Sequence, residues 1–289
     1  MPRAPMPPSR QPKPAARRIA DQLEPAARRA FLAAMRDVQA SVDLDAIAEA
    51  LRVNNVAEIG RLIDSMGETL QPLARILAQG FRVTGETTGA EVAQQTGQSF
   101  AFDAVNPRSV NWARQNSARL VLDVTNEGRE AIRRVLGEAF SEGIDVRRTA
   151  RRIRESIGLT SRLEQAVIHY RRDLRADGRT AEAIDRLGAR YSTKLLNYRS
   201  KVIARTEIIS ASAHGQHEAW KQAIHEGVLG PQTQRIWLVA YDDRVCETCL
   251  PMEDQTVGMD EQFITGDGES VLMPPAHPAC RCTTGLNFA

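Results

Sequence analysis

The chain has 289 residues, of which 42% are hydrophobic and 5% are aromatic, a composition that suits helices packed through aliphatic side chains. No apolar run is long enough to span a bilayer and no hydrophobic signal core stands near the N-terminus, so we expect a protein kept in a cytoplasm-like compartment. The net charge of +2 conceals a division, because residues 240–289 hold nine acids against two arginines and leave +9 on the remainder. This division predicts that the two parts face different surroundings, with the basic part suited to nucleic acid or to an acidic protein surface.

Residues 1–18 form a segment of unusual composition, with six prolines, five lysines or arginines and no acid. Proline opposes a helix, and like charges repel one another. We therefore predict a basic, proline-rich, disordered arm that is either an inert tail or becomes ordered on a partner.

Residues 19–142 carry apolar side chains at helical spacing and predict a helical N-terminal region that is suited to binding a partner. Three glycines within residues 80–89 predict a break between helices, and Asn106-Pro107 predicts a second break before another helix. This region contains no catalytic signature.

The next helix is predicted to begin at Asp145, which has the character of an N-cap. Five arginines gather on the side away from its apolar stripe: Arg147, Arg148, Arg151, Arg152 and Arg154. These arginines are either a solvated helix face or candidate contacts with DNA phosphates. Ser161 to Glu164 then has the form of a capping box and opens a further helix.

The longest periodic segment runs from residue 188 to residue 226 without a proline and predicts one long helix. Gly215 is its weakest point and Gly227 its stop. Thr206 and His217 fall on the apolar stripe, where each needs a hydrogen-bond partner. Arg205 flanks the stripe and is predicted to reach a buried carboxylate or carbonyl.

After this helix, residues 235–239 predict a strand and residues 242–243 a turn. All four cysteines then lie within 37 residues, as Cys246-Glu-Thr-Cys249 and, after a gap of 27 residues, as His277-Pro-Ala-Cys280-Arg-Cys282. Thiolates and an imidazole at this spacing favour a structural zinc site that takes four ligands from the five residues. Two disulfides, or four reduced thiols packed as small hydrophobic side chains, are the alternatives.

The histidines and cysteines match no zinc-enzyme signature. Nucleobase deaminases need His-x-Glu and Pro-Cys-x-x-Cys, whereas His217 and Glu218 are adjacent and no proline precedes Cys246. Zincins need His-Glu-x-x-His, whereas His214 and His217 are three residues apart with the glutamate outside them. A redox role for Cys246 and Cys249 lacks the βαβ context of thioredoxin. We therefore expect a noncatalytic protein.

A series of short motifs, taken in order, resembles the phage Mu F-like minor head proteins, which are head-morphogenesis proteins of tailed bacteriophages. The motifs extend over residues 143–285 and include Gly143-Ile-Asp-Val, Thr149-Ala-Arg-Arg-Ile-Arg, Ile203-Ala-Arg-Thr-Glu207, Asp242-Asp-Arg-Val-Cys246-Glu-Thr-Cys249 and Pro274-Pro-Ala-His277-Pro-Ala-Cys280-Arg-Cys282.

The resemblance implies a structural virion component that lies inside the capsid near the portal and passes through the host cytoplasm during assembly. It implies association with the portal protein and a link to DNA packaging, retention or delivery. The major capsid protein, a scaffolding protein and packaged double-stranded DNA are its other implied partners. Arg205, Thr206 and Glu207 carry over as the helix signature, and the four cysteines with His277 as the terminal cluster. The chain departs from the expected pattern at His214-Gly215, where an asparagine is expected before the glycine.

We predict a mainly α protein with an elongated helical N-terminal region at residues 19–142. Residues 143–289 are predicted to form a head-morphogenesis domain whose small C-terminal α+β unit is stapled by the Cys/His cluster. The alternative function is a DNA-binding structural module that uses the basic arm and the arginine-rich helix. A zinc-dependent enzyme ranks below both.

Overall fold

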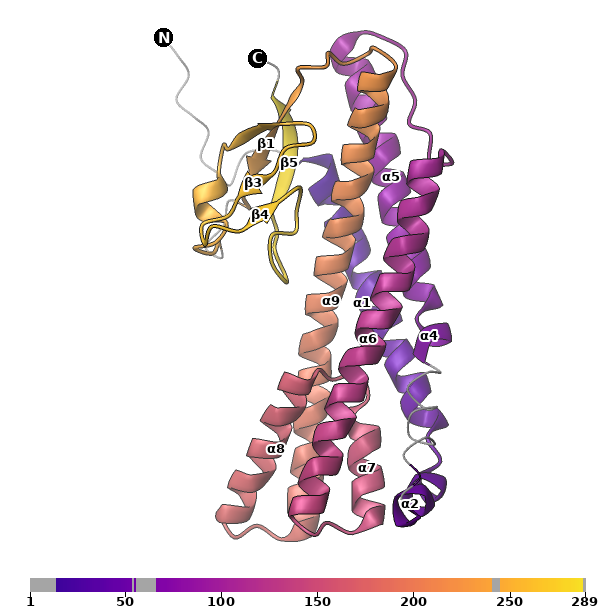
Figure 1. The fold of residues 1–289 in the computed structure, drawn as a ribbon, viewed down its shortest axis with the longest axis vertical. Coiled ribbons are helices and arrows are strands. Elements are labelled where there is room, and N and C mark those ends of the chain that lie inside the picture. Colours follow the sequence, from indigo (N-terminus) through magenta and orange to yellow (C-terminus); the bar gives the residue numbers. More distant parts are fainter. Residues whose placement is uncertain (1–13, 54, 56–65, 241–244, 288–289) are drawn as a thin grey trace. The chain divides into compact units, whose positions relative to one another are not determined.

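The protein is mainly helical, as predicted, and its strands are confined to the C-terminal part (Figure 1). The computed structural model describes residues 14–53, 55, 66–240 and 245–287. The helices are α1 (Ala15–Ser41), α2 (Leu44–Arg52), α4 (Met66–Thr69), α5 (Gln71–Thr96), α6 (Pro107–Ser141), α7 (Val146–Ser156), α8 (Ser161–Ala176) and α9 (Ala181–His225). The strands are β1 (Gln234–Leu238), β2 (Thr256–Gly258), β3 (Phe263–Ile264), β4 (Ser270–Val271) and β5 (Thr283–Asn287), with the short 3-10 helix η2 (Leu250–Met252) between β1 and β2.

The described residues fall into two compact units. Unit 1 takes in the chain up to Ala27, Arg75–Ala113 and everything from Val202 onward, whereas unit 2 consists of Arg28–Ala74 and Arg114–Lys201. The predicted division of the chain near residue 143 stays a prediction. None of the described helices is long and apolar enough to cross a membrane.

The strands of unit 1 lie beside the C-terminal half of α9 (Figure 1). Strand β1 is central in a three-stranded antiparallel sheet, with β2 on one side and β5 on the other, and β3 pairs with β4. A core of buried side chains fills this small unit: Trp237, Val239, Cys249, Met252, Phe263, Cys280 and Cys282. Three of the four cysteines are thus part of the hydrophobic core of the C-terminal unit.

Two predicted boundaries differ from the structure. Helix α1 begins at Ala15, so residues 15–18 of the predicted arm are helical, because Ala15 and Ala16 bury their methyl groups and Arg17 pairs with Asp21 one turn later. Residues 1–13 of that arm lie outside the described residues. Helix α9 begins at residue 181, seven residues before the predicted start, and Thr180 caps its first turn.

The predicted break at residues 80–89 is wrong, because these residues lie in the middle of α5. Gly85 allows the Phe102 ring to approach the helix, since a Cβ atom there would stand 2.3 Å from that ring.

The predicted capping box is displaced by one residue. Thr160 is the N-cap of α8, and its hydroxyl accepts from the Leu163 amide. The turn predicted at residues 242–243 lies outside the described residues.

Gly215 does not interrupt α9, which is continuous from Ala181 to His225. A Cβ atom at this position would stand 2.1 Å from the carbonyl oxygen of Phe81 in α5. Gly215 therefore lets two helices of unit 1 approach each other backbone to backbone. Gly227 does end the helix, with a φ of +74°.

We predict that Gly215→Ala lowers the free energy of unfolding by about 1–3 kcal/mol, because the added methyl group meets backbone that cannot rotate away. Gly137→Ala is the matched control, since Gly137 lies inside α6 and a methyl group added there would meet open space. That control should stabilise the protein by about 0.5–1 kcal/mol through helix propensity. Urea unfolding of both variants measures the two values, and equal effects would contradict the close approach at Gly215.

Candidate metal centre

The five predicted ligands converge in the C-terminal unit. Cys246 and Cys249 lie on a turn that leads into η2, where the amides of Cys249 and Leu250 both donate to the Cys246 carbonyl at 3.1 and 2.9 Å. A second turn, closed by the Cys280 amide and the His277 carbonyl at 3.1 Å, brings the other residues to the same place. The two turns therefore bring Cys246 and Cys249 close to His277, Cys280 and Cys282.

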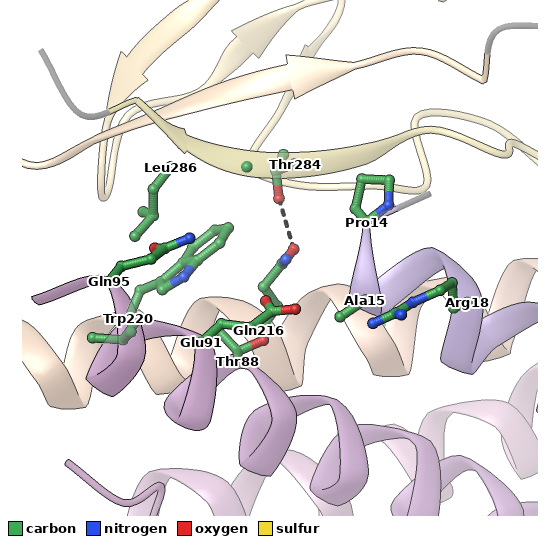
Figure 2. A pocket seen from close by; sticks show the side chains of 12 residues that line it. Pro14, Ala15, Arg18, Thr88, Glu91, Gln95, Gln216, Trp220, Thr284 and Leu286 are labelled. Atoms are coloured by element: carbon green, nitrogen blue, oxygen red, sulfur yellow. Dashed lines mark hydrogen bonds between the residues drawn. The ribbon is translucent and has the colours of Figure 1, made fainter. Parts of the chain in front are cut away.

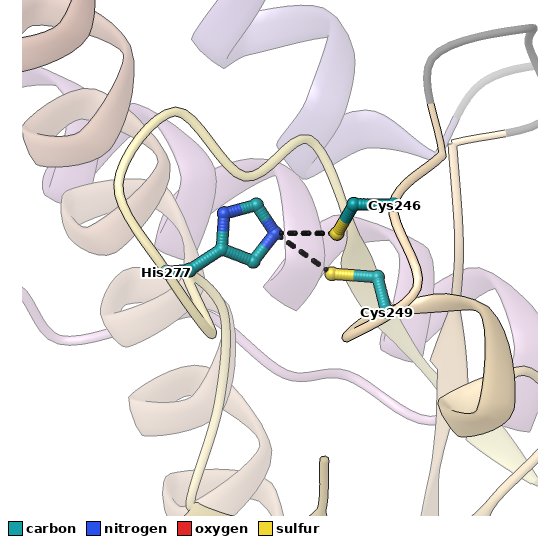
Figure 3. Close-up of side chains that lie close together, drawn as sticks. All are labelled: Cys246, Cys249 and His277. Atoms are coloured by element: carbon teal, nitrogen blue, oxygen red, sulfur yellow. Dashed lines mark hydrogen bonds between the residues drawn. The ribbon is translucent and has the colours of Figure 1, made fainter. Parts of the chain in front are cut away.

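His277 Nε2 lies 3.1 Å from Cys246 Sγ and 3.0 Å from Cys249 Sγ (Figure 3). The other ring nitrogen, Nδ1, is 2.9 Å from the Pro278 carbonyl oxygen. A carbonyl can only accept a hydrogen bond, so Nδ1 carries the proton and the lone pair of Nε2 points at the two sulfurs. Metal-bound histidines are oriented in the same way.

The remaining cysteines extend the cluster through Cys249. Its sulfur is 3.8 Å from Cys280 Sγ, and Cys249, Cys280 and Cys282 form a second group of three ligand atoms within 4.8 Å of one another. Hydrogen bonds from Cys249 and Cys282 lower the pKa of Cys280, which favours a thiolate at this cysteine. Cys249 belongs to both groups, and a single ion there would draw ligands from each.

The separation of the sulfur atoms fits the ligands of a zinc ion better than it fits disulfide bonds. All four cysteines are free, and the 3.8 Å separation of Cys249 and Cys280 is far longer than a sulfur–sulfur bond of about 2.05 Å. A tetrahedral zinc ion with zinc–sulfur bonds of about 2.3 Å places two sulfurs about 3.8 Å apart. The nitrogen–sulfur separations are shorter than the corresponding edge of about 3.5 Å, so His277 would move outward slightly to bind the same ion.

Side chains from two helices hold the loop that carries His277, Cys280 and Cys282. Thr206 of α9 accepts a hydrogen bond from the Ala279 amide at 2.9 Å, at a residue whose φ of +60° is rare for alanine. Arg17 of α1 donates to the Arg281 carbonyl at 2.6 Å. The loop is therefore fastened on both sides of Cys280.

Arg205, the residue before Thr206, forms a bidentate pair with Glu24 of α1 at 2.8 and 3.0 Å. This pair joins α9 to the helix that supplies Arg17. Arg205 thus contacts a carboxylate, as predicted, but Glu24 is half-buried and not buried. Glu207 is also buried in α9, with 8% of its surface exposed.

Arg235, which no sequence motif singled out, is fully buried in β1. Its guanidinium donates to the carbonyls of Gly258, Glu261 and Leu272 and lies 5.0 Å from the centre of the Phe263 ring. Burial lowers the pKa of Arg235 to about 10. Arg235 thus ties the end of β2 to the segments that follow β2 and β4. The sequence signal for its burial is its position in the strand, two residues before Trp237 and therefore on the same face of the sheet.

The histidines of α9 lie apart from this centre. His214 Nδ1 is 3.1 Å from the Met273 sulfur, and its ring packs against the edge of Trp112. Burial, with the nearby positive charge of Arg235, lowers the pKa of His217 to about 3 and keeps the ring neutral. Among the residues that the structure describes, neither histidine belongs to a group of three potential metal ligands.

The predicted arginine face of α7 is divided by the structure. Arg147 and Arg151 are exposed and Arg154 is half-buried, but Arg148 donates to Asp185 at 2.9 and 3.1 Å. Arg152 points into unit 2, where 2% of its side chain is exposed and Glu138 lies 3.4 Å away. The prediction that all five arginines share one solvated face is therefore wrong, because carboxylates from α6 and α9 draw two of them inward.

The described residues define a mainly helical class of protein with a Cys/His cluster in a small C-terminal β unit. The family described as Phage Mu protein F like protein matches residues 130–285, which include the Arg205–Thr206 helix and the whole cluster. The chain belongs to this family of phage head morphogenesis proteins. The match begins 13 residues before the first motif of the predicted resemblance. No curated protein and no solved structure matches the chain significantly.

We predict that Thr206→Val lowers the affinity of the protein for zinc about tenfold, since outer-shell partners that orient ligands have effects of this order. Thr206→Ser keeps the acceptor and should bind zinc as the wild type does. Thr193→Val is a control in the same helix, where the hydroxyl donates only to the Ala189 carbonyl. Competition with a chromophoric chelator measures the affinities, and an unchanged affinity of Thr206→Val would show that the loop is positioned without Thr206.

Unit 2 contains a buried cluster of charges near Arg152. Glu164 is 3.7 Å from Arg171 of the same helix, and each has 1% of its side chain exposed. Arg171 also donates to Glu155 at 2.6 Å. Burial raises the pKa of Glu164 from 4.5 to about 8, although Arg171 opposes the shift. The folded protein therefore holds a proton on Glu164 that the unfolded chain has released at neutral pH.

This shift predicts that stability falls as the pH rises from about 4.5 to about 8, because the unfolded state binds fewer protons in this window. The slope contributed by Glu164 is at most about 1.4 kcal/mol per pH unit. Glu164→Gln stays neutral at every pH and should lose this part of the dependence. Urea unfolding at pH 5.5 and 8.5 tests it, and identical pH dependence in the two proteins would refute the assignment.

Proposed function

We propose that this protein is a noncatalytic minor head protein that associates with the portal protein inside the capsid of a tailed bacteriophage. It would assist procapsid assembly and the packaging, retention or delivery of DNA. The family match over residues 130–285 carries this proposal, because it takes in the Cys/His end of the chain and the part of α9 that anchors it.

The noncatalytic role is supported by the surroundings of the cysteines. Cys249, Cys280 and Cys282 are at most 4% exposed and pack with Trp237 and Phe263 in one core. A catalytic zinc ion keeps one coordination position open for water, whereas four thiolate or imidazole ligands close the site. Zinc would therefore act here as a structural ion that holds the two cysteine turns together, with four ligands drawn from Cys246, Cys249, His277, Cys280 and Cys282.

The portal-facing surface that we propose lies on α6. Leu122 and Phe140 are 60% and 94% exposed, the latter being nearly as accessible as in an extended chain. They are 18 residues apart, which is five turns of an α-helix, so both side chains lie on the same face. Exposed apolar side chains on one helix face are typical of a surface that packs against another subunit.

We predict that the protein copurifies with the portal ring when the two are coexpressed, and that Phe140→Ser reduces the amount recovered at least tenfold. The substitution removes no intramolecular packing and should leave the unfolding midpoint unchanged. Tyr198→Ser is the control, since Tyr198 is another exposed aromatic residue, at 52%, on α9 of the same unit. Absence of the wild-type chain from the portal fraction would refute the association, and equal recovery of both variants would refute the role of α6.

Packaged DNA is the second proposed partner, and the exposure of Arg147 and Arg151 is the observation that favours it. Arg148 and Arg152 cannot be counted with them, because both are engaged by carboxylates. The two exposed arginines support contact with DNA phosphates. The affinity of the protein for DNA must then weaken steeply as salt is added. Binding to duplex DNA that is insensitive to salt would remove this part of the proposal.

A further inference from the structure

Unit 1 contains a cavity of about 360 Å³ that neither the metal centre nor the family match explains. Its walls come from the start of α1, the C-terminal half of α5, the last turns of α9 and strand β5 (Figure 2). Its volume falls in the range of ligand-binding pockets. The polar and aromatic side chains in its walls are Arg18, Thr88, Glu91, Gln95, Gln216 and Trp220.

The cavity offers hydrogen-bonding groups at its base and apolar groups at one end. Thr88 is 1% exposed, and its hydroxyl has no hydrogen-bond partner among the described residues. Gln216 is fixed in place, since its Oε1 accepts from the Thr284 hydroxyl at 3.2 Å. Leu286 and Trp220 face each other at the end of the cavity (Figure 2). A carbonyl-rich chain with small apolar groups would satisfy the Thr88 hydroxyl and cover the Trp220 ring.

The charge in the cavity favours a cation. Glu91 stands in its wall, and burial raises the pKa of this carboxyl group, with Arg18 as the opposing cation. Arg18 itself is exposed. A second positive charge placed beside Glu91 would stabilise the carboxylate that burial disfavours.

We propose that this cavity is the docking site for the chain's own basic, proline-rich segment, residues 1–13. The segment contains Arg3, Arg10 and Lys13, five prolines and no acid, so it supplies cations for Glu91 and carbonyl groups for Thr88. Prolines favour the extended polyproline conformation, which aromatic and hydrogen-bonding side chains bind in other recognition grooves. The proposal is independent of the metal centre and of the portal association.

Connectivity supports this occupant over a separate molecule. Pro14 and Ala15, the next residues of the chain, themselves line the cavity. A tethered segment of 13 residues spans up to about 40 Å in the polyproline conformation, enough to turn back across the site. Tethering gives it an effective concentration in the millimolar range, which a free peptide would have to exceed.

Trypsin cleavage of the full-length protein after Arg10 tests the proposal, because a docked segment is cut only while it is released. We expect Glu91→Gln to accelerate this cleavage about tenfold, through loss of a charge-assisted contact. Glu86→Gln is the matched control, since Glu86 lies on the same helix, is 48% exposed and pairs with Arg82. Equal cleavage rates in the wild type and Glu91→Gln, or equal acceleration in both variants, would overturn the proposal.

Two further measurements identify the occupant. Arg10→Gln alters only the segment and should accelerate cleavage after Arg3, whereas an unchanged rate would count against docking. A photoreactive benzophenone side chain in place of Gln95, at the exposed rim, should form a crosslink to residues 1–13 within one chain. Crosslinks between two chains, or none to this segment, would refute docking within the chain.

Discussion

The hydrogen bond from the Ala279 amide to the Thr206 hydroxyl is the contact on which the C-terminal unit depends. The loop from His277 to Cys282 has a turn but no helix or strand of its own, so groups outside it fix the rest of its path. Thr206 fixes the loop from one helix and Arg17 from another, and the two helices are themselves joined by the pair of Arg205 and Glu24. The sulfur and imidazole groups can approach one another because this scaffold sets the path of the loop.

Arginine contributes to the interior of this protein as well as to its surface. Arg235 donates to three carbonyls in unit 1, and Arg199 donates to the Gly158 carbonyl in unit 2 at 2.6 Å while its guanidinium lies over the Phe31 ring. A guanidinium suits this task because it offers five donors in a fixed plane and stacks on aromatic rings. The formal charge of a region therefore overstates the positive charge that it presents to a nucleic acid, as Arg152 illustrates.

Local chemistry made part of this structure predictable from the sequence. The N-cap at Asp145, the stop at Gly227 and the strand at residues 235–239 follow from short-range rules, and the structure contains all three with shifts of at most a residue. The convergence of the cysteines was also predictable, because their spacing is that of a metal-binding pair of turns.

Sequence and structure differ where a tertiary contact overrides a local preference. Gly85 and Gly215 are points of close approach within helices and not breaks, because Phe102 and Phe81, which need the space, come from other segments of the chain. The partners of Arg152 likewise come from other helices, and no periodicity along α7 reveals them. For Thr206, the sequence predicts only that a hydroxyl on an apolar stripe needs a hydrogen-bond partner. Its partner is a backbone amide 73 residues away.

We propose that one metal ion holds the two cysteine turns together. Elemental analysis of the purified full-length protein, combined with thiol titration before and after chelation, tests it most directly. We predict one zinc ion per chain and four thiols that become fully reactive only when zinc is removed. A metal-free protein with no reactive thiols would contradict the claim, because the cysteines would then be joined as two disulfides.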